Sequence, residues 1–155
     1  WITDNNDEQW YKFTVADGGK FTLKIMAYMK YVYVDLFTED LSTEIINVDY
    51  FAYGSETAPS TETYTKVLSA GTYYLKISRD TYNGKYKLCA DYESYGLTNQ
   101  GADSYDSPQI LPMNQTVTGA MTETDKEDWY RLNVSSSGNY VIDISAYMRY
   151  MDLYL

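Results

Sequence analysis

The chain contains no histidine and a single cysteine, and each scarcity removes a class of function. Without histidine, these residues cannot build a Ser-His-Asp triad, a Cys-His pair or a histidine-ligated zinc site. Cys89 has no second cysteine in the chain with which to form a disulfide. It is either a small residue on a partly covered strand face or a free thiol available to a partner chain. We expect no enzymatic activity.

Basic residues and long apolar runs are also scarce. The chain has 12 Lys and Arg against 22 Asp and Glu, which gives a net charge of −10. Such a surface repels nucleic acid and anionic membranes. The sequence has no apolar run long enough to cross a bilayer. We therefore expect no nucleic-acid partner and no membrane insertion.

Tyrosine is abundant instead, with 19 residues. Aromatic residues favour strands, and tyrosine combines a rigid apolar ring with a polar tip that suits binding surfaces. The composition thus indicates a β protein with aromatic contact area.

The sequence also repeats itself. The segment EQWYKFTV (residues 8–15) returns as EDWYRLNV (residues 127–134), so Trp10 corresponds to Trp129 at an offset of 119 residues. The register holds without a gap from residues 3–31 to residues 122–150. A period of about 119 residues is the length of a whole domain. The sequence therefore predicts a tandem repeat whose second copy covers about a third of a unit.

Apolar residues alternate with polar ones through most of the chain. Alternation of period two is the pattern of strands with one buried face, and turn residues such as Asn83-Gly84 separate the segments. No long window shows helical periodicity. The sequence predicts an all-β fold, an antiparallel β-sandwich of the jelly-roll-like kind.

The motifs of this chain resemble those of the bacterial pre-peptidase C-terminal (PPC) domain family. DKEDWYRLNV (residues 125–134) is similar to its acidic Trp-Tyr signature, and residues 138–142 and 150–155 resemble the two strands that follow it. SAGTYYLKI (residues 69–77) and GKYKL (residues 84–88) resemble its later strands. The motifs occur in the order of the family.

The resemblance implies a division of the chain. Residues 1–93 form a PPC-like sandwich that lacks its first strand, residues 94–107 form a linker, and residues 108–155 hold the first strands of a second repeat. The missing strand type is ILPMNQTVTG (residues 110–119). We expect the chain to be a window of a longer tandem array. The resemblance also implies a non-catalytic domain that is extracellular or on the bacterial cell surface.

Two acidic loops are candidate calcium sites, because calcium takes six to eight oxygen ligands. The alternative is a solvated turn whose Asp and Asn side chains bond to their own backbone. No other cofactor is expected. The candidate ligands are Asp4, Asn6 and Asp7 in the first copy and Glu123, Asp125 and Asp128 in the second.

A tyrosine- and methionine-rich motif, AYM followed by Lys or Arg and Tyr, occurs in both copies. It is either a contact patch for a protein or glycan, or a corner that covers the sandwich edge. The candidate patch residues are Tyr28, Met29, Tyr31, Tyr33, Tyr147, Met148, Tyr150 and Tyr154.

Two functions remain open at this point. The first is a structural module of a surface or filament-forming protein, whose partners are other copies of itself or adjacent repeats. Units would be joined when a strand containing Ile110, Leu111, Val117 and Gly119 completes a neighbouring sandwich. The second is an accessory domain of a secreted bacterial hydrolase that binds extracellular protein fibres or polysaccharide.

Overall fold

The computed structural model describes residues 2–98 and 100–155, and it does not describe the side chains of residues 49–52. The described residues form strands, turns and irregular segments with no helix, so the all-β prediction is confirmed. The strands are β1 (Glu8–Val15), β2 (Gly19–Ala27), β3 (Lys30–Thr38), β4 (Glu44–Tyr53), β5 (Ser60–Leu68), β6 (Gly71–Arg79), β7 (Tyr86–Ser94), β8 (Gln109–Ile110) and β9 (Tyr130–Arg131).

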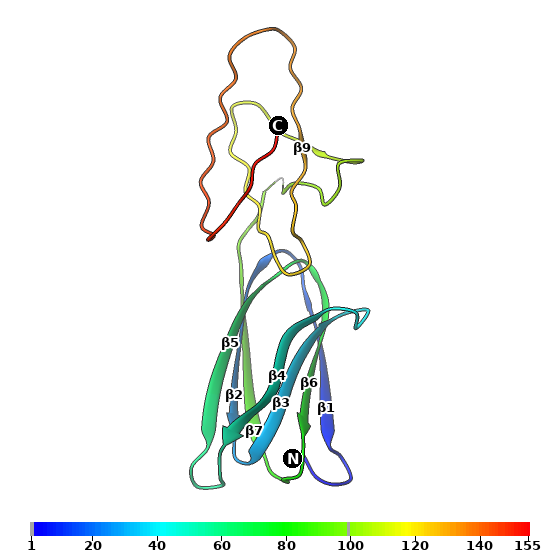
Figure 1. Ribbon diagram of the computed structural model, residues 1–155, viewed down its shortest axis with the longest axis vertical. Helices are drawn as coiled ribbons and strands as arrows, with labels where there is room; N and C mark the ends of the chain where they lie inside the picture. Colours follow the sequence, from blue (N-terminus) through cyan, green and yellow to red (C-terminus); the bar gives the residue numbers. More distant parts are fainter. Residues whose placement is uncertain (1, 99) are drawn as a thin grey trace.

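The first seven strands form two antiparallel sheets that face each other (Figure 1). One sheet has the order β1-β6-β3-β4, and the other has the order β5-β2-β7. Consecutive strands β1, β2 and β3 thus alternate between the sheets and never pair with one another. Their partners all come from β4–β7, which lie later in the chain.

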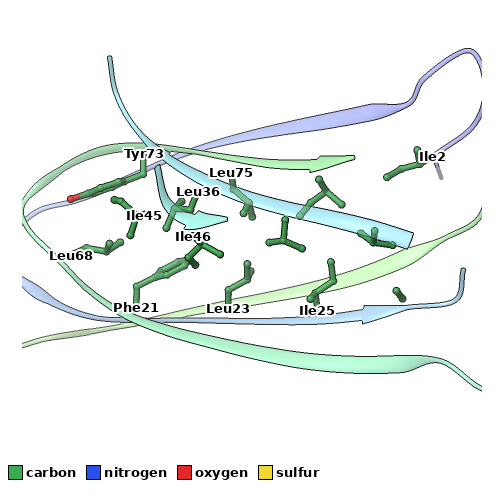
Figure 2. Packing of buried hydrophobic residues seen from close by; sticks show 14 of the residues in the cluster. Ile2, Phe21, Leu23, Ile25, Leu36, Ile45, Ile46, Leu68, Tyr73 and Leu75 are labelled. Atoms are coloured by element: carbon green, nitrogen blue, oxygen red, sulfur yellow. The ribbon is translucent and has the colours of Figure 1, made fainter. Parts of the chain in front are cut away.

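The core lies between the two sheets and follows the alternation of the sequence. On β2, Phe21, Leu23 and Ile25 are buried, while the residues between them are half-buried or exposed. Figure 2 shows these side chains meeting Leu36 and Leu75 from the opposite sheet. Burial of this apolar surface stabilises the two-layer arrangement.

The connection between β2 and β3 passes from one sheet to the other. Met29 lies in this connection and is 3% exposed. Gly84 packs against it so closely that a Cβ at Gly84 would lie 2.5 Å from Cβ of Met29. Met29, predicted as part of a contact patch, is therefore a core residue that closes one end of the sandwich.

The other side of the sandwich is bordered by the edge strands β1 and β7. The hydroxyl groups of Tyr11 and Tyr86 are 2.6 Å apart and join these two edges. Even so, Tyr11 remains 42% exposed and Ala90 is exposed, although both lie on the inward side of their strands. The core is therefore incompletely covered between β1 and β7.

Residues beyond β7 lie past one end of the sandwich and are mostly irregular (Figure 1). β8 and β9 form a short parallel pair, and isolated bridges join Thr98 to Thr118 and Ala102 to Trp129. Residues 132–155 contain no strand, although the sequence predicts strands there. Period-two alternation by itself supplies no paired neighbour, and residues 132–155 have no ladder partner among the described residues.

The described part of the chain has no helix that could span a bilayer.

Candidate functional site

The acidic loop of the first copy is a tight turn attached to β6. Thr3 and Asn6 exchange two backbone hydrogen bonds of 3.0 and 2.9 Å. The Asp4 carboxylate pairs with the Arg79 guanidinium at 2.7 Å, and the Arg79 amide donates to the carbonyl of Asp7. The Asp4 carboxylate is thus engaged by a cation of the protein, while Asn6 and Asp7 are exposed. This geometry agrees with the turn interpretation.

The acidic loop of the second copy is arranged differently, because Asp125 is buried and 6% exposed. Thr122 shapes the loop: its hydroxyl oxygen accepts from the amides of Thr124 and Asp125. Glu123 points away and pairs with Lys66 of β5 at 2.9 Å. Of the three predicted calcium ligands in this copy, Asp125 and Asp128 lie together and Glu123 does not.

Linker residues complete this acidic cluster. Gln100 donates to Oδ2 of Asp125 at 2.5 Å, and a Cβ at Gly101 would lie 2.6 Å from Cβ of Asp128. Oδ1 of Asp125 and Oδ1 of Asp128 are buried and accept no hydrogen bond from the described residues. The sequence does not predict Gln100 and Asp103 as site residues, because an acidic linker carries no signal of where its side chains return in the fold.

Burial and mutual repulsion raise the pKa values of the carboxyl groups in this cluster. Burial, together with the charges of Asp103 and Asp128, raises the pKa of Asp125 to about 6. Burial and the charge of Asp103 also raise the pKa of Asp128. The cluster therefore favours a proton, a hydrogen-bond donor or a cation near Asp125.

A cleft of about 540 Å³ adjoins the cluster, between the end of the sandwich and the second copy. Asp17 and Ser69 line it from turns of the sandwich, while Gln100, Asp103 and Asp125 line it from the other side. These oxygen atoms are the ligand type that calcium prefers. Among the described residues, however, no three acidic, His or Cys side chains are gathered closely enough to hold a metal ion.

The predicted tyrosine patch is divided by the structure. Tyr31 has a positive φ of 54° and packs edge-on against Tyr53 and Tyr82. Lys85 and Lys87 lie over the ring of Tyr28, 4.9 and 5.7 Å from its centroid, and Tyr33 is half-buried. The first-copy motif is thus largely explained as the corner between β2 and β3.

The second-copy motif is exposed. Tyr147 is 102% exposed, and Met148, Tyr150 and Tyr154 are exposed as well. No strand presents them as a common face, because residues 132–155 are irregular.

A second aromatic surface lies on the outward face of β1, β3 and β6. Trp10 is 45% exposed and stacks on Phe37 at 5.9 Å. Lys76 lies near both rings and forms an ion pair of 2.7 Å with Asp35. The alternation in EQWYKFTV (residues 8–15) places Trp10 on the face opposite Tyr11 and Phe13, but no sequence pattern shows that Phe37 and Lys76 meet it.

The tryptophans of the two copies share one local contact. Nε1 of Trp10 donates to Glu8 at 3.0 Å, and Nε1 of Trp129 donates to Glu127 at 2.9 Å. The repeated Glu-x-Trp pattern therefore orients the indole in the same way in both places.

No protein-family model matches this chain, and no curated protein matches its sequence.

Proposed function

We propose that this chain is a non-catalytic assembly module of an extracellular or surface protein built from tandem PPC-like repeats, joined to its neighbours by strand complementation. The observation that carries the proposal is the outer edge of β7, which pairs with no strand of the described residues and lies next to the part of the core where Ala90 is exposed. Unpaired strand edges accept further strands readily. The assignment to the PPC family and the sandwich with its repeat are parts of this proposal.

The structure contains the first rung of the ladder that such a strand would form. Ile2 and Gly84 exchange two antiparallel hydrogen bonds, Ile2 N to Gly84 O at 3.0 Å and Gly84 N to Ile2 O at 3.1 Å. Gly84 lies just before β7, so a strand that continues from the Ile2 position toward lower numbers would run antiparallel along β7. Its backbone would face residues 86, 88, 90 and 92, since every second residue of a strand points its N–H and C=O to the same edge.

The second copy contains a segment that fits this place. Because residue 121 is the counterpart of Ile2, the register sets Gly119 opposite Tyr86, Val117 opposite Leu88 and Leu111 opposite Ser94. Leu111, Met113 and Val117 would then face the incompletely covered core. In the structure, Ile110 is 47% exposed and is the one described residue of this segment that lies in a strand. These features support residues 110–119 of a neighbouring copy as the proposed occupant of the edge.

A peptide of residues 109–119 tests the proposal. It should bind the full chain and raise its unfolding temperature, as measured by calorimetry. A peptide with Leu111 and Val117 replaced by aspartate should not bind. In the protein, Ala90→Pro should abolish binding because it removes an N–H from the free edge, whereas Ala90→Ser should retain it. Equal binding of both peptides would contradict the proposal, as would globular monomers in electron micrographs at micromolar and millimolar protein concentrations.

Calcium is a separate part of this proposal and concerns the cleft beside Asp125. Oδ1 of Asp125 and Oδ1 of Asp128 support it, because both are buried and accept no hydrogen bond from the described residues. The described carboxylates are too far apart to hold a metal ion as they stand, so the loop would have to close around it. Millimolar calcium should then raise the unfolding temperature of the chain but not that of the Asp125→Asn variant.

The alternative function is an accessory domain that binds protein fibres or polysaccharide. The surface formed by Trp10, Phe37 and Lys76 favours it, because exposed aromatic rings with nearby charged groups suit such ligands. Retention on collagen, cellulose, chitin or peptidoglycan that is lost in Trp10→Ala would support this alternative, and absence of retention would remove it.

A further inference from the structure

Three tyrosine rings meet at the end of the sandwich where the β2–β3 and β6–β7 connections pass between the sheets. Tyr31 is the second residue of β3, Tyr53 is the last residue of β4, and Tyr82 lies in the β6–β7 connection. The ring centroid of Tyr31 lies 5.4 Å from that of Tyr82 and 5.9 Å from that of Tyr53. Tyr82 is 44% exposed and Tyr53 is 71% exposed, so that reagents in solution reach the cluster.

Contacts between the two connections hold the rings of the closer pair together. The amide of Tyr28 donates to the carbonyl oxygen of Lys85 at 2.9 Å. A Cβ at Gly84 would lie 2.5 Å from Cβ of Met29, so the two backbones pack closely there. One ring follows Met29 by two residues and the other precedes Gly84 by two residues. The packing of the connections thus sets the distance between the rings.

The conformation of each tyrosine is further restricted. Tyr31 has a φ of 54°, in the left-handed region that bulky residues seldom adopt. Such a backbone conformation persists only where the surrounding structure fixes it. The ammonium group of Lys30 lies over the ring of Tyr82, 5.4 Å from its centroid. Both rings are therefore positioned before any reaction takes place, which favours a reaction between them over a reaction between molecules.

Two phenol rings in contact react with each other when both are oxidised. Each phenol gives up one electron and one proton and becomes a phenoxyl radical. The two radicals form a carbon–carbon bond between the ring carbons next to the hydroxyl-bearing carbons. The hydrogen on each of these carbons then moves to the phenolic oxygen, which restores both hydroxyl groups. Hydrogen peroxide takes up the two electrons and two protons and becomes two molecules of water, so the reaction balances.

We propose that Tyr31 and Tyr82 are a modification site at which a haem peroxidase and hydrogen peroxide form a dityrosine cross-link within one chain. The inference goes beyond the assembly function and does not depend on it, because it stands on contacts within residues 28–85. The new bond joins the β2–β3 and β6–β7 connections, both of which pass between the sheets. It restricts the unfolded chain as a disulfide does and therefore stabilises the sandwich.

Other tyrosine contacts of the sandwich are less suited to this bond. Tyr11 and Tyr86 meet through their hydroxyl groups, whose oxygen atoms are 2.6 Å apart, so oxygen atoms and not ring carbons make the contact. Tyr53 is the nearest competitor for Tyr31, at the longer centroid distance of 5.9 Å. The cross-link is accordingly assigned to the pair with the shorter distance.

Peptide mapping of the full chain tests the proposal. The protein is treated in dilute solution with a haem peroxidase and hydrogen peroxide, and the monomer is isolated and digested with trypsin. Trypsin releases residues 31–66 and residues 80–85, and Tyr82 is the sole tyrosine of the shorter peptide. The expected product is these two peptides joined, with the sum of their masses less two hydrogen atoms and with dityrosine fluorescence. The treated monomer should also unfold at a higher temperature than the untreated protein.

Two phenylalanine variants keep the rings and change only the reactive phenols. Tyr82→Phe should lose the joined peptides and the rise in unfolding temperature. Tyr53→Phe is the matched control, and it should retain both. The untreated variants should unfold close to the temperature of the untreated parent, which shows that the sandwich has formed.

Three outcomes would overturn the inference. If the peptide of residues 80–85 stayed unmodified while dityrosine formed within residues 31–66, the partner of Tyr31 would be Tyr53 or another tyrosine of that peptide. Fragment ions that placed the bond to Tyr82 on a tyrosine other than Tyr31 would contradict the assigned pair. Absence of dityrosine in the monomer, when the same treatment couples a short tyrosine peptide, would exclude the cross-link altogether. The binding of the peptide of residues 109–119 is measured separately, so strand complementation stands or fails independently of this result.

Discussion

At the scale of single residues, Asp125 shows how far burial can change the role of a carboxylate. The sequence offers it as one of several oxygen ligands in an exposed loop. The structure buries it beside Asp128 and the linker residue Asp103, and its pKa rises to about 6. The hydrogen bond that Gln100 donates to Asp125 lowers the pKa but does not offset this rise.

This pKa predicts a pH dependence that Asp125→Asn should remove. The ordinary pKa is 3.8, so the folded state binds the proton more tightly than the unfolded state between pH 4 and pH 6. The stabilisation that comes from the protonated form is complete below pH 4 and is lost as the pH rises through 6. At pH 7 without calcium, Asp125→Asn should therefore be more stable than the parent by about 1–3 kcal/mol.

Urea unfolding at pH 3.5 and pH 7 measures the difference, and Asp106→Asn, at an exposed linker position, is the control. Equal stabilities of Asp125→Asn and the parent at pH 7 would show that the carboxylate is solvated.

At the scale of strands, the alternation of apolar residues is sufficient to predict which residues of most first-copy strands face the core. β2 and β6 follow it closely, with inward residues such as Leu23 and Ile77 fully buried. The order of strands within the sheets does not follow from this alternation. β1 pairs with β6 across more than fifty residues of sequence, and no local sequence pattern predicts that pairing.

The approach of β2 to β7 gives a prediction with a matched control. A Cβ at position 19 would lie 2.4 Å from a backbone oxygen that cannot rotate away, so the strands must separate. Gly19→Ala should therefore lower the free energy of unfolding by about 1–3 kcal/mol, a typical cost of overpacking. Gly138→Ala should change it by less than about 0.5 kcal/mol in dilute monomer, because the side chain enters open space. Thermal unfolding of both variants measures the difference. Similar losses of stability in Gly19→Ala and Gly138→Ala would contradict the close approach of β2 to β7.

At the scale of the whole molecule, the chain combines a closed core with an exposed apolar segment. The core of residues 2–94 is held by ladders in both sheets, whereas residues 132–155 have neither strands nor buried side chains. Segments of this kind open with little cost in free energy and are accessible to proteases.

Limited proteolysis should therefore divide the molecule. In dilute solution, trypsin should cut first after Lys126, Arg131 or Arg149, all of which are exposed, and leave the sandwich of residues 2–94 intact. Mass spectrometry of the early fragments identifies the cuts. Early cleavage inside the strands of residues 8–94 would contradict this division.

The sequence by itself determined that the chain is a β protein, where most strands of the first copy lie, and that its two copies are in register. These features are local: period-two alternation places Leu23 and Ile25 on one face whatever the partner strand is. The outward direction of Trp10 followed from the same alternation. The tight turn predicted at Asn83-Gly84 did not, because these residues lie in a longer connection between the two sheets, where Gly84 pairs with Ile2.

The tertiary structure alone decided which carboxylates are buried and which strands remain without partners. Asp103 lies in the predicted linker and Asp125 lies in the predicted second repeat. The two residues line the same cleft only because the chain returns beside the end of the sandwich. Likewise, alternation predicts strands in residues 138–155, but a strand needs a neighbour for its backbone hydrogen bonds. Residues 132–155 have no such neighbour among the described residues, so the alternation there does not become a strand.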